Sequence, residues 1–416
     1  MNEVLNLPSH GGHLALHWYE WDTLGYALGS NHTKCDRTNA PCGFDTHYPD
    51  YFPARVGCKE SVKAMQDAGM RVIPYINGQL YDTLIPRWKK DNAMAATQKY
   101  VAETMKTKTN TPELNPHLEH FDGITSAVMC PATLYWQGVM RDTILKIVNE
   151  IGFDGCYVDQ VGNGEQRNCA DPSHNHTING GSFWAESFYK IMADVRANMN
   201  DKSMFMTEGI VEEVSGTGFD ILLGLEFTNL PMWHAIYGGY GYATGRAGAI
   251  TSPLNNGLCV ELTQQFMVGG TMGWFTYQNY DNQFFDPANK GYVQFIQNLS
   301  AARIAGKPWM VHGRATRTLT YNNNNTDLQA GCFLRERESE TPSLVCALAL
   351  PTDSGTASYA LAMDPSRYGL VVPTGSHVEV TDLLTGSALG SYASQVTCHG
   401  SIAPLSVRVL RLRVSH

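Results

Sequence analysis

The chain of 416 residues has 30 basic and 39 acidic side chains, and its net charge of -9 argues against nucleic acid as a partner, since phosphate binding needs clustered Lys and Arg. Hydrophobic residues make up 43% of the chain and charged residues 17%, which is typical of a globular protein with a large core. No run of 18 apolar residues occurs, so the sequence predicts no transmembrane helix and no membrane partner.

The first residues, MNEVLNLPSHGG, lack the basic and apolar regions of a signal peptide. The chain has four Asn-x-Ser/Thr triplets, which matter only in a secreted protein, so secreted or lumenal and cytoplasmic locations both stay open. The ten cysteines are scattered without a Cys-x-x-Cys motif, which argues against a zinc ribbon. Cys332 could pair with Cys346, and Cys35 could pair with Cys42.

Strand-like and helix-like segments alternate from residue 14 to about residue 310. Apolar runs predict strands, and apolar residues at helical spacing predict helices that stop at glycine. The predicted strands are 14–21, 70–78, 124–132, 154–159, 203–209, 219–227 and 271–278. The predicted helices are 57–69, 135–152, 181–200 and 298–306.

This alternation indicates βαβ units and a parallel sheet. About eight such strands in roughly 300 residues favour a closed (β/α)8 barrel over an open doubly wound sheet. The Gly-rich motifs of nucleotide-binding folds are missing from the sequence. After about residue 312, short alternating runs separated by turn residues predict an antiparallel β-sandwich. We therefore expect an α/β barrel domain over residues 1–312 and a C-terminal β-sandwich over residues 313–416.

Two acids each follow an apolar strand at the point where a loop begins. Asp159 ends the run GCYVD, and Glu208 ends the run MFMTE. In this count they end the fourth and fifth strands, and neighbouring barrel strands lie about 5 Å apart. Their carboxylates can therefore reach the roughly 5–5.5 Å separation of a retaining glycosidase. We predict Asp159 as the nucleophile and Glu208 as the acid/base, with Glu226, at the end of the next strand, as the competitor of Glu208.

Sugar sites need aromatic faces and planar polar groups, and several such residues stand near other predicted strand ends. The predicted substrate-binding residues are Trp18, Tyr19, Glu20, Tyr75, Asn77, Gln160, His174, His176, Glu226 and Trp274. Cys169, Asp171, His174 and His176 follow Asp159 in one loop and could bind a metal. We favour the interpretation that His174 or His176 forms a hydrogen bond with a sugar hydroxyl over the interpretation that they bind a metal. Neither a metal nor a cofactor is therefore expected.

Several motifs in order resemble a known family. The segments HWYEW, FDTHYPDYFPAR, RVIPYINGQLYD, MCPATLYWQ, GFDGCYVDQVG, CADPSHNHTINGG and TEG are similar to domain-of-unknown-function family 6259. That family resembles retaining α-glycosidases, including the endo-α-N-acetylgalactosaminidases. The resemblance covers roughly residues 14–310 and implies a nucleophile after the fourth strand, matching Asp159, and an acid/base after the fifth, matching Glu208.

The α-amylase-type enzymes share this layout but carry Arg where this chain has Tyr157, which puts an α-glucan substrate in doubt. Larger relatives also carry an N-terminal β-sandwich, so we expect a compact version or a truncated gene model here. The sequence thus predicts a retaining, α-specific glycoside hydrolase with an oligosaccharide or glycoconjugate substrate. A non-catalytic carbohydrate-binding barrel and a metal-dependent hydrolase using the His174/His176 loop are the alternatives.

Overall fold

The structure is a computed structural model that describes residues 14–22, 47–102, 113–121, 124–163, 167–199, 203–209, 218–224, 232–237, 242–245, 253–273, 283–316, 321–323, 325–336 and 341–415. The chain divides into two compact units, and the division falls between Leu222 and Leu223. Among the described residues, no helix is long and apolar enough to cross a membrane.

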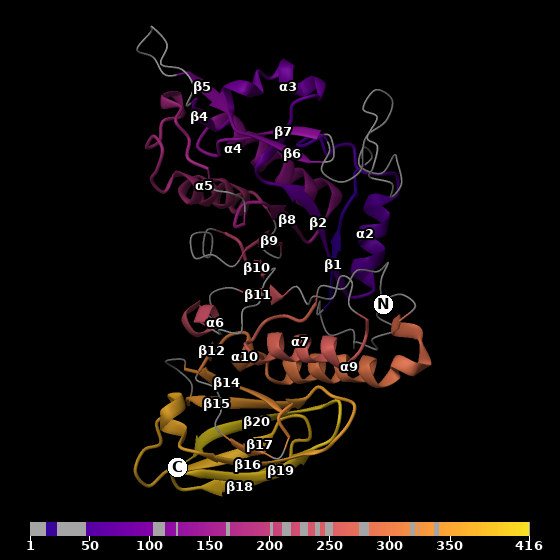
Figure 1. The fold of residues 1–416 in the computed structure, drawn as a ribbon, viewed down its shortest axis with the longest axis vertical. Helices are drawn as coiled ribbons and strands as arrows, with labels where there is room; N and C mark the ends of the chain where they lie inside the picture. The colour runs from indigo at the N-terminus through magenta and orange to yellow at the C-terminus, as the bar shows by residue number, and fades with distance from the viewer. Residues whose placement is uncertain are drawn as a thin grey trace. The chain divides into compact units, whose positions relative to one another are not determined.

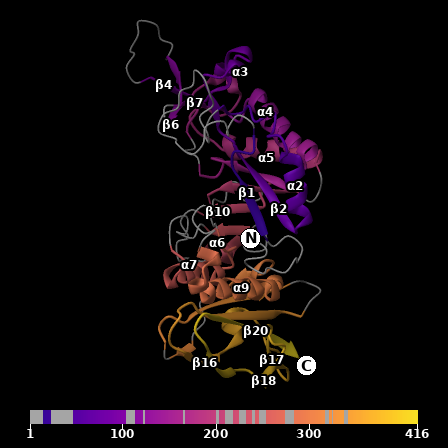
Figure 2. The same ribbon diagram turned by 90° about the vertical axis from the view of Figure 1, so that its right-hand side faces the viewer.

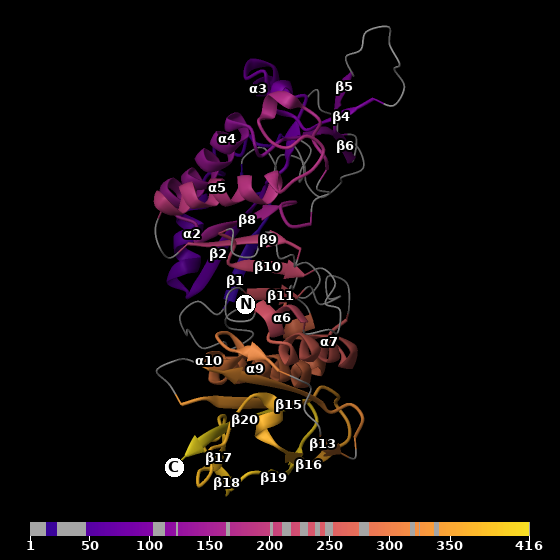
Figure 3. The same cartoon turned by 90° about the vertical axis from the view of Figure 1, so that its left-hand side faces the viewer.

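The first unit is built on a parallel sheet. Its strands β1 (Leu14–Trp18), β2 (Met70–Asn77), β8 (Gly155–Asp159) and β9 (Met204–Glu208) follow one another in this order, and the division between the units falls within β10 (Ile221–Gly224). The pairings of β1 with β2, β2 with β8 and β8 with β9 are parallel. The helices are α2 (Cys58–Asp67), α4 (Leu134–Leu145) and α5 (Phe183–Ala197), and α4 and α5 lie side by side along the sheet (Figures 1 and 3).

The sequence explains why β8 forms and where it begins. Its first four residues, Gly-Cys-Tyr-Val, are buried, as expected for a strand covered on both faces. Gly155 has a φ of 141°, and a Cβ at this position would lie 1.6 Å from the Met204 carbonyl oxygen. Glycine therefore allows β8 to approach β9. The helix before β8 ends at Gly152, as predicted, after a π-helical turn over Lys146–Ile151.

Asp154 fixes the amino end of β8 to β2. Its side chain is 7% exposed, and one oxygen pairs with Arg71 Nη1 at 2.6 Å. The other oxygen accepts hydrogen bonds from the Val72 backbone N–H and from Gln66 Nε2, both at 2.9 Å. This cluster aligns β2 and β8 at the end of the sheet opposite the one where Asp159 stands.

The prediction that residues 124–132 form a strand of the parallel sheet was wrong. Residues Ile124–Val128 form β7, which pairs antiparallel with β3 (Leu80–Asp82) and β6 (Leu118–Phe121). As a result β2 pairs directly with β8, and Asp159 and Glu208 end the third and fourth strands of the described parallel sheet. The remaining elements of this region are β4 (Lys99–Val101), β5 (Leu114–Pro116), α3 (Pro86–Lys90) and the 3-10 turns Ala93–Ala96 and Pro172–His174.

The second unit contains two antiparallel sheets. The larger has the order β12 (Arg314–Ala315), β14 (Gln329–Arg335), β15 (Ser343–Leu350), β20 (Ser406–Ser415), β17 (His377–Asp382) and β18 (Ala388–Tyr392). The smaller has the order β13 (Tyr321–Asn323), β16 (Ala357–Met363) and β19 (Val396–Ile402). The unit's other elements are β11 (Tyr242–Gly245), α6 (Met232–Tyr237), α7 (Asn256–Met267), α9 (Lys290–Ala305), α10 (Lys307–Met310) and the 3-10 turns Pro287–Asn289 and Pro365–Tyr368.

All eight residues of β15 are buried, because this strand is covered on both faces. Leu344, Cys346 and Leu348 belong to the core shared with the smaller sheet, whereas Val345 and Ala347 belong to the core shared with α7 and α9. Figure 2 shows α9 running over the larger sheet near β20. Cys332 and Cys346 face each other across β14 and β15 as free thiols with sulfurs 2.7 Å apart, so their predicted pairing stays a prediction.

The structure thus confirms an α/β fold with a parallel sheet, followed by antiparallel sheets. Closure of the parallel sheet into an eight-stranded barrel and a domain boundary at residue 312 stay predictions. Cys35 and Cys42, the other predicted pair, lie outside the described residues.

Candidate active site at the carboxyl ends of β8 and β9

Asp159 and Glu208 are the last residues of two adjacent parallel strands. The register pairs Cys156 with Phe205 and Tyr157 with Met206. Asp159 lies two residues beyond Tyr157, and Glu208 lies two residues beyond Met206. The same register therefore places Asp159 opposite Glu208 at the carboxyl edge of the sheet. Both side chains are half-buried, so they are accessible to a ligand. The carboxyl edge is where parallel α/β sheets place their active sites.

Two tyrosine hydroxyls hold the Asp159 carboxylate. Tyr75, on β2, donates to Oδ2 at 2.7 Å, and Tyr157, on β8 itself, donates to Oδ1 at 3.1 Å. Both carboxylate oxygens therefore have a hydrogen-bond donor, which fixes the plane of the group. Tyr157 is the residue at which the sequence departs from the α-amylase-type enzymes, which carry Arg there, and its hydroxyl supplies a donor to Asp159 from that position.

Aromatic rings pack around these two tyrosines. His17, on β1, contacts Tyr157 with ring centroids 4.4 Å apart and Tyr19 at 4.5 Å, and Tyr19 stacks on Tyr75 at 4.8 Å. Burial lowers the pKa of His17 to about 3, so its ring is neutral at physiological pH. Burial, followed by the negative charges of Asp159 and Glu208, raises the pKa of Tyr157 far above its usual value, so the hydroxyl stays protonated.

A polar network joins the next residue, Gln160, to other strands. Asn77, which pairs in register with Asp159, donates from Nδ2 to Gln160 Oε1 at 3.0 Å. Gln160 Nε2 then donates to Glu119 Oε2 at 3.3 Å, and Gln79 Nε2 donates to Glu119 Oε1 at 3.0 Å. Arg167 pairs with the same Glu119 at 3.3 Å. The loop that follows Asp159 is thus anchored by amides and by the ion pair between Arg167 and Glu119.

The backbone immediately beyond both acids is in the left-handed region. Gln160 has a φ of 58°, which is uncommon for a residue with a Cβ, and Gly209 has a φ of 93°. A Cβ on Gly209 would lie 2.6 Å from the Gly162 carbonyl oxygen. The loops after β8 and β9 therefore touch through their backbones, and such backbone positions are often found at functional sites.

The structure brings four of the predicted substrate-binding residues to the strand end that carries Asp159 and Glu208. These are Tyr19, Tyr75, Asn77 and Gln160. Trp18 instead packs its ring against Phe153, with centroids 6.1 Å apart. Glu20, which has a φ of 52°, accepts a hydrogen bond from Arg55 at its backbone oxygen. Glu226 and Trp274 lie outside the described residues.

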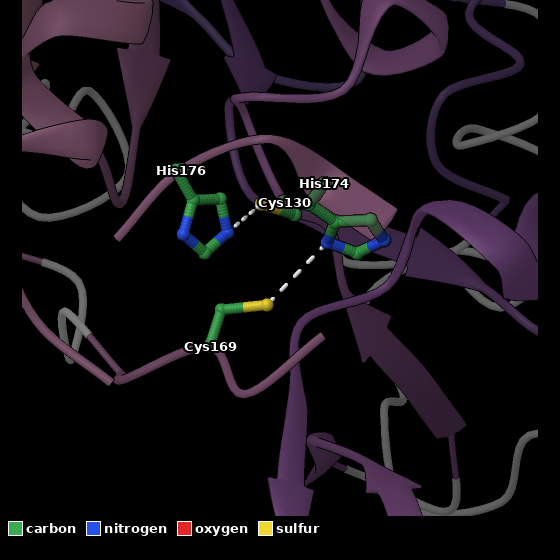
Figure 4. A group of neighbouring side chains, drawn as sticks. All are labelled: Cys130, Cys169, His174 and His176. Carbon is green, nitrogen blue, oxygen red and sulfur yellow. Dashed lines mark hydrogen bonds between the residues drawn. The ribbon is translucent and has the colours of Figure 1, made fainter. Parts of the chain in front are cut away.

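The two predicted histidines lie in a separate cluster. His174 and His176 come together with Cys169 and with Cys130, and one ligand atom from each of the four residues lies within 4.8 Å of the others (Figure 4). Asp171, which the sequence grouped with possible metal ligands, is outside this set. It accepts hydrogen bonds from the Ser173 backbone N–H and from Lys99 Nζ, and so caps the short helical turn at Pro172.

Sequence reasoning missed Tyr157, Glu119 and Cys130 as candidates. The sequence did contain an indication for Tyr157, because a residue two positions before Asp159 in a strand points to the same face as Asp159. Glu119 and Cys130 had none, because each comes from a segment remote in sequence from the loop that it meets.

A family model described as "Domain of unknown function (DUF6259)" matches residues 39–247, half of the chain. The chain belongs to this family, which confirms the resemblance found in the sequence.

Two curated relatives are named as hydrolases. A protein of Bacteroides thetaiotaomicron named "Putative glycoside hydrolase" is 24% identical over 387 residues, covering 90% of this chain and 51% of that protein. A protein of Monosiga brevicollis named "Putative glycoside hydrolase 22789" is 28% identical over 275 residues, covering 63% of this chain and 22% of that protein. The chain thus spans about half of the first relative and about a fifth of the second.

Solved glycosidase structures share the fold. An alpha-amylase from Geobacillus thermoleovorans has a TM-score of 0.54 at 10% identity, covering 99% of this chain and 90% of its own. A maltogenic alpha-amylase from Thermotoga neapolitana has a TM-score of 0.55 at 12% identity, covering 99% of this chain and 92% of its own. At this identity the likeness concerns the fold alone.

Proposed function

We propose that this protein is a retaining glycoside hydrolase that acts on α-linked sugars, with Asp159 as nucleophile and Glu208 as acid/base. The observation that carries the proposal is the register of β8 and β9, which makes the two acids level at the carboxyl edge of adjacent strands. Names of the curated relatives support the enzyme class. The α-specificity rests on the resemblance of the strand-end motifs to those of retaining α-glycosidases.

In this mechanism Asp159 attacks the anomeric carbon, and the bond to the leaving oxygen breaks as Glu208 donates its proton. Glu208 then removes a proton from water, which attacks the anomeric carbon and displaces Asp159. The hydroxyls of Tyr75 and Tyr157 hold the Asp159 carboxylate in one orientation. Because these two hydrogen bonds already orient the carboxylate, Asp159 has to rearrange less before it attacks the anomeric carbon. Tyr19 is half-buried, and its ring is suited to stack on sugar C–H groups.

The test is a hydrolysis screen with aryl α- and β-glycosides on the wild type, Asp159→Asn, Glu208→Gln and the control Glu150→Gln. Glu150 is an exposed acid in the π-helical turn Lys146–Ile151, which precedes β8, whereas Asp159 stands at the other end of that strand. We expect one α-glycoside to be cleaved, a loss of at least about a thousandfold in both strand-end variants, and no change in the control. Azide should restore activity to Glu208→Gln on an activated substrate.

Nuclear magnetic resonance of the first product should show the α-anomer, as double displacement retains configuration. Activity that survives Asp159→Asn would overturn the assignment of the nucleophile. Binding on a glycan array without hydrolysis of any substrate would favour the alternative of a non-catalytic carbohydrate-binding protein.

We further propose that the parallel sheet belongs to a (β/α)8 barrel over residues 1–312 and that residues 313–416 form a C-terminal β-sandwich. The alternation of strands and helices and the two antiparallel sheets support this division. Limited proteolysis should then cut first near residue 312. A stable fragment beginning near residue 223, where the chain divides by compactness, would contradict it.

A further inference from the structure

We propose that Cys130, Cys169, His174 and His176 form a structural zinc site that fastens the loop between β8 and α5 to the segment after β7. One donor atom from each residue lies within 4.8 Å of the other three. Three of the residues are buried and His176 is half-buried. Figure 4 shows the four side chains converging from these two segments.

The separations of the donor atoms suit tetrahedral coordination. Zinc binds Cys sulfur at about 2.3 Å and His nitrogen at about 2.0–2.1 Å, so a tetrahedral angle separates the two ligands by about 3.5 Å. Cys130 Sγ lies 3.5 Å from His176 Nε2, and Cys169 Sγ lies 3.4 Å from His174 Nδ1. Two sulfurs and two nitrogens in this arrangement favour zinc over hard cations such as calcium and magnesium.

The second ring nitrogen of each histidine has an acceptor that fixes the tautomer. His174 Nε2 lies 2.8 Å from the Ala95 carbonyl oxygen, and His176 Nδ1 lies 2.8 Å from the Thr177 carbonyl oxygen. A carbonyl oxygen only accepts, so each of these nitrogens carries the proton. The lone pairs of His174 Nδ1 and His176 Nε2 are then directed at the cysteine sulfurs. Bonds of this kind to the second nitrogen are usual for metal-binding histidines.

The surrounding backbone holds the four side chains in place. Cys130 N–H donates to the Ala96 carbonyl at 2.8 Å, next to the Ala95 carbonyl that binds His174. The His176 ring stacks on Phe183 with centroids 4.1 Å apart and an angle of 13°. The orientation of both histidines is thus set by groups outside the cluster, as expected for a preorganised site.

Four protein ligands leave no coordination position for water or substrate, which is the pattern of structural zinc sites. The site therefore argues against a metal-dependent hydrolase that uses the His174/His176 loop. We infer that the zinc restricts the movement of the loop between β8 and α5, which begins directly after Asp159 and Gln160. The inference depends on the cluster alone and is independent of the proposed hydrolase activity.

The test measures zinc in the purified full chain by mass spectrometry of the metal. We expect about one zinc per chain in the wild type and less than about a tenth of that in Cys130→Ser and His176→Ala. His176→Cys should keep the zinc, because a Cys₃His set also binds it. The matched controls Cys58→Ser and His120→Ala, from the same unit but outside the cluster, should keep it as well.

Two further readouts do not depend on the folding of any variant. Cobalt added to the chelator-treated wild type should give the visible spectrum of a tetrahedral ion together with a thiolate charge-transfer band. Chelator should also increase the rate of proteolytic cleavage within residues 160–182 by at least about tenfold. A wild type that binds neither zinc nor cobalt, a zinc content unchanged in Cys130→Ser and His176→Ala, or a Cys130–Cys169 disulfide in the non-reduced peptide map would overturn the proposal.

Discussion

The hydroxyl of Tyr75 on β2 donates a 2.7 Å hydrogen bond to Oδ2 of Asp159 on β8. The two strands are neighbours, and Asp159 pairs in register with Asn77, two residues beyond Tyr75. A tyrosine on the neighbouring strand can therefore hold this carboxylate, while Tyr157 holds its other oxygen from the same strand. The orientation of the proposed nucleophile thus depends on two hydroxyl groups.

Removing either hydroxyl should slow catalysis while the fold is kept. For Tyr75→Phe and Tyr157→Phe we expect kcat to fall by about tenfold to a hundredfold on the best aryl glycoside, because the carboxylate loses one of its two orienting bonds. Steady-state kinetics would show the change in kcat rather than in KM. The matched control is Tyr135→Phe, whose hydroxyl binds Tyr81 and Asp91 instead, and whose kcat should match the wild type.

Asp154→Ala should destabilise the protein by about 2–4 kcal/mol. The change leaves the buried Val72 N–H without its carboxylate acceptor and removes the partner of Arg71. Urea unfolding followed by circular dichroism measures the loss. Asp67→Ala breaks the exposed pair with Lys63 and should cost less than about 0.5 kcal/mol. Equal effects of the two substitutions would show that Asp154 does not hold β2 to β8.

Gly155 and Gly152 offer a comparison between backbone strain alone and strain combined with a steric clash. Both have positive φ, but a Cβ at Gly152 meets open space, whereas one at Gly155 meets the Met204 backbone. Gly152→Ala should therefore cost only about 1 kcal/mol, and Gly155→Ala should cost more than about 3 kcal/mol. Thermal unfolding of both variants checks the difference, and similar melting temperatures would contradict the close approach of β8 to β9.

We expect the protein to become less stable as the pH is lowered, because protonation of His17 favours the unfolded chain. Its pKa is about 3 in the folded chain because of burial, and about 6.5 in an unfolded chain. The unfolded chain therefore binds a proton that the folded chain does not, and stability present above pH 6.5 is lost as the pH falls toward 3. This loss is at most about 2 to 3 kcal/mol at pH 4.5.

His17→Phe keeps a ring against Tyr157 but removes the titrating group. Between pH 7 and pH 4.5, urea unfolding should therefore show a smaller loss of stability in this variant than in the wild type. Equal losses in the two proteins would mean that His17 is not responsible for this part of the pH dependence.

Local patterns in the sequence were sufficient to find the strands that carry the proposed catalytic acids. An apolar run that ends in an acid and a glycine-rich loop defined β8, and a similar run defined β9. The same reasoning failed for β7, because an apolar run does not reveal whether its partner is parallel or antiparallel. Cys130 was missed for a related reason, since its cluster forms only when a segment 39 residues upstream of Cys169 folds against the later loop.

The position of β20 has a consequence for quality control in the cell. This strand pairs with β15 on one side and with β17 on the other, so it joins the two halves of the larger sheet. A chain that stopped before Ser406 would expose two unpaired strand edges at once, one of them on the fully buried β15. Exposed apolar edges template aggregation. Truncation products that lack β20 should therefore become substrates for chaperones and proteases rather than partly active proteins.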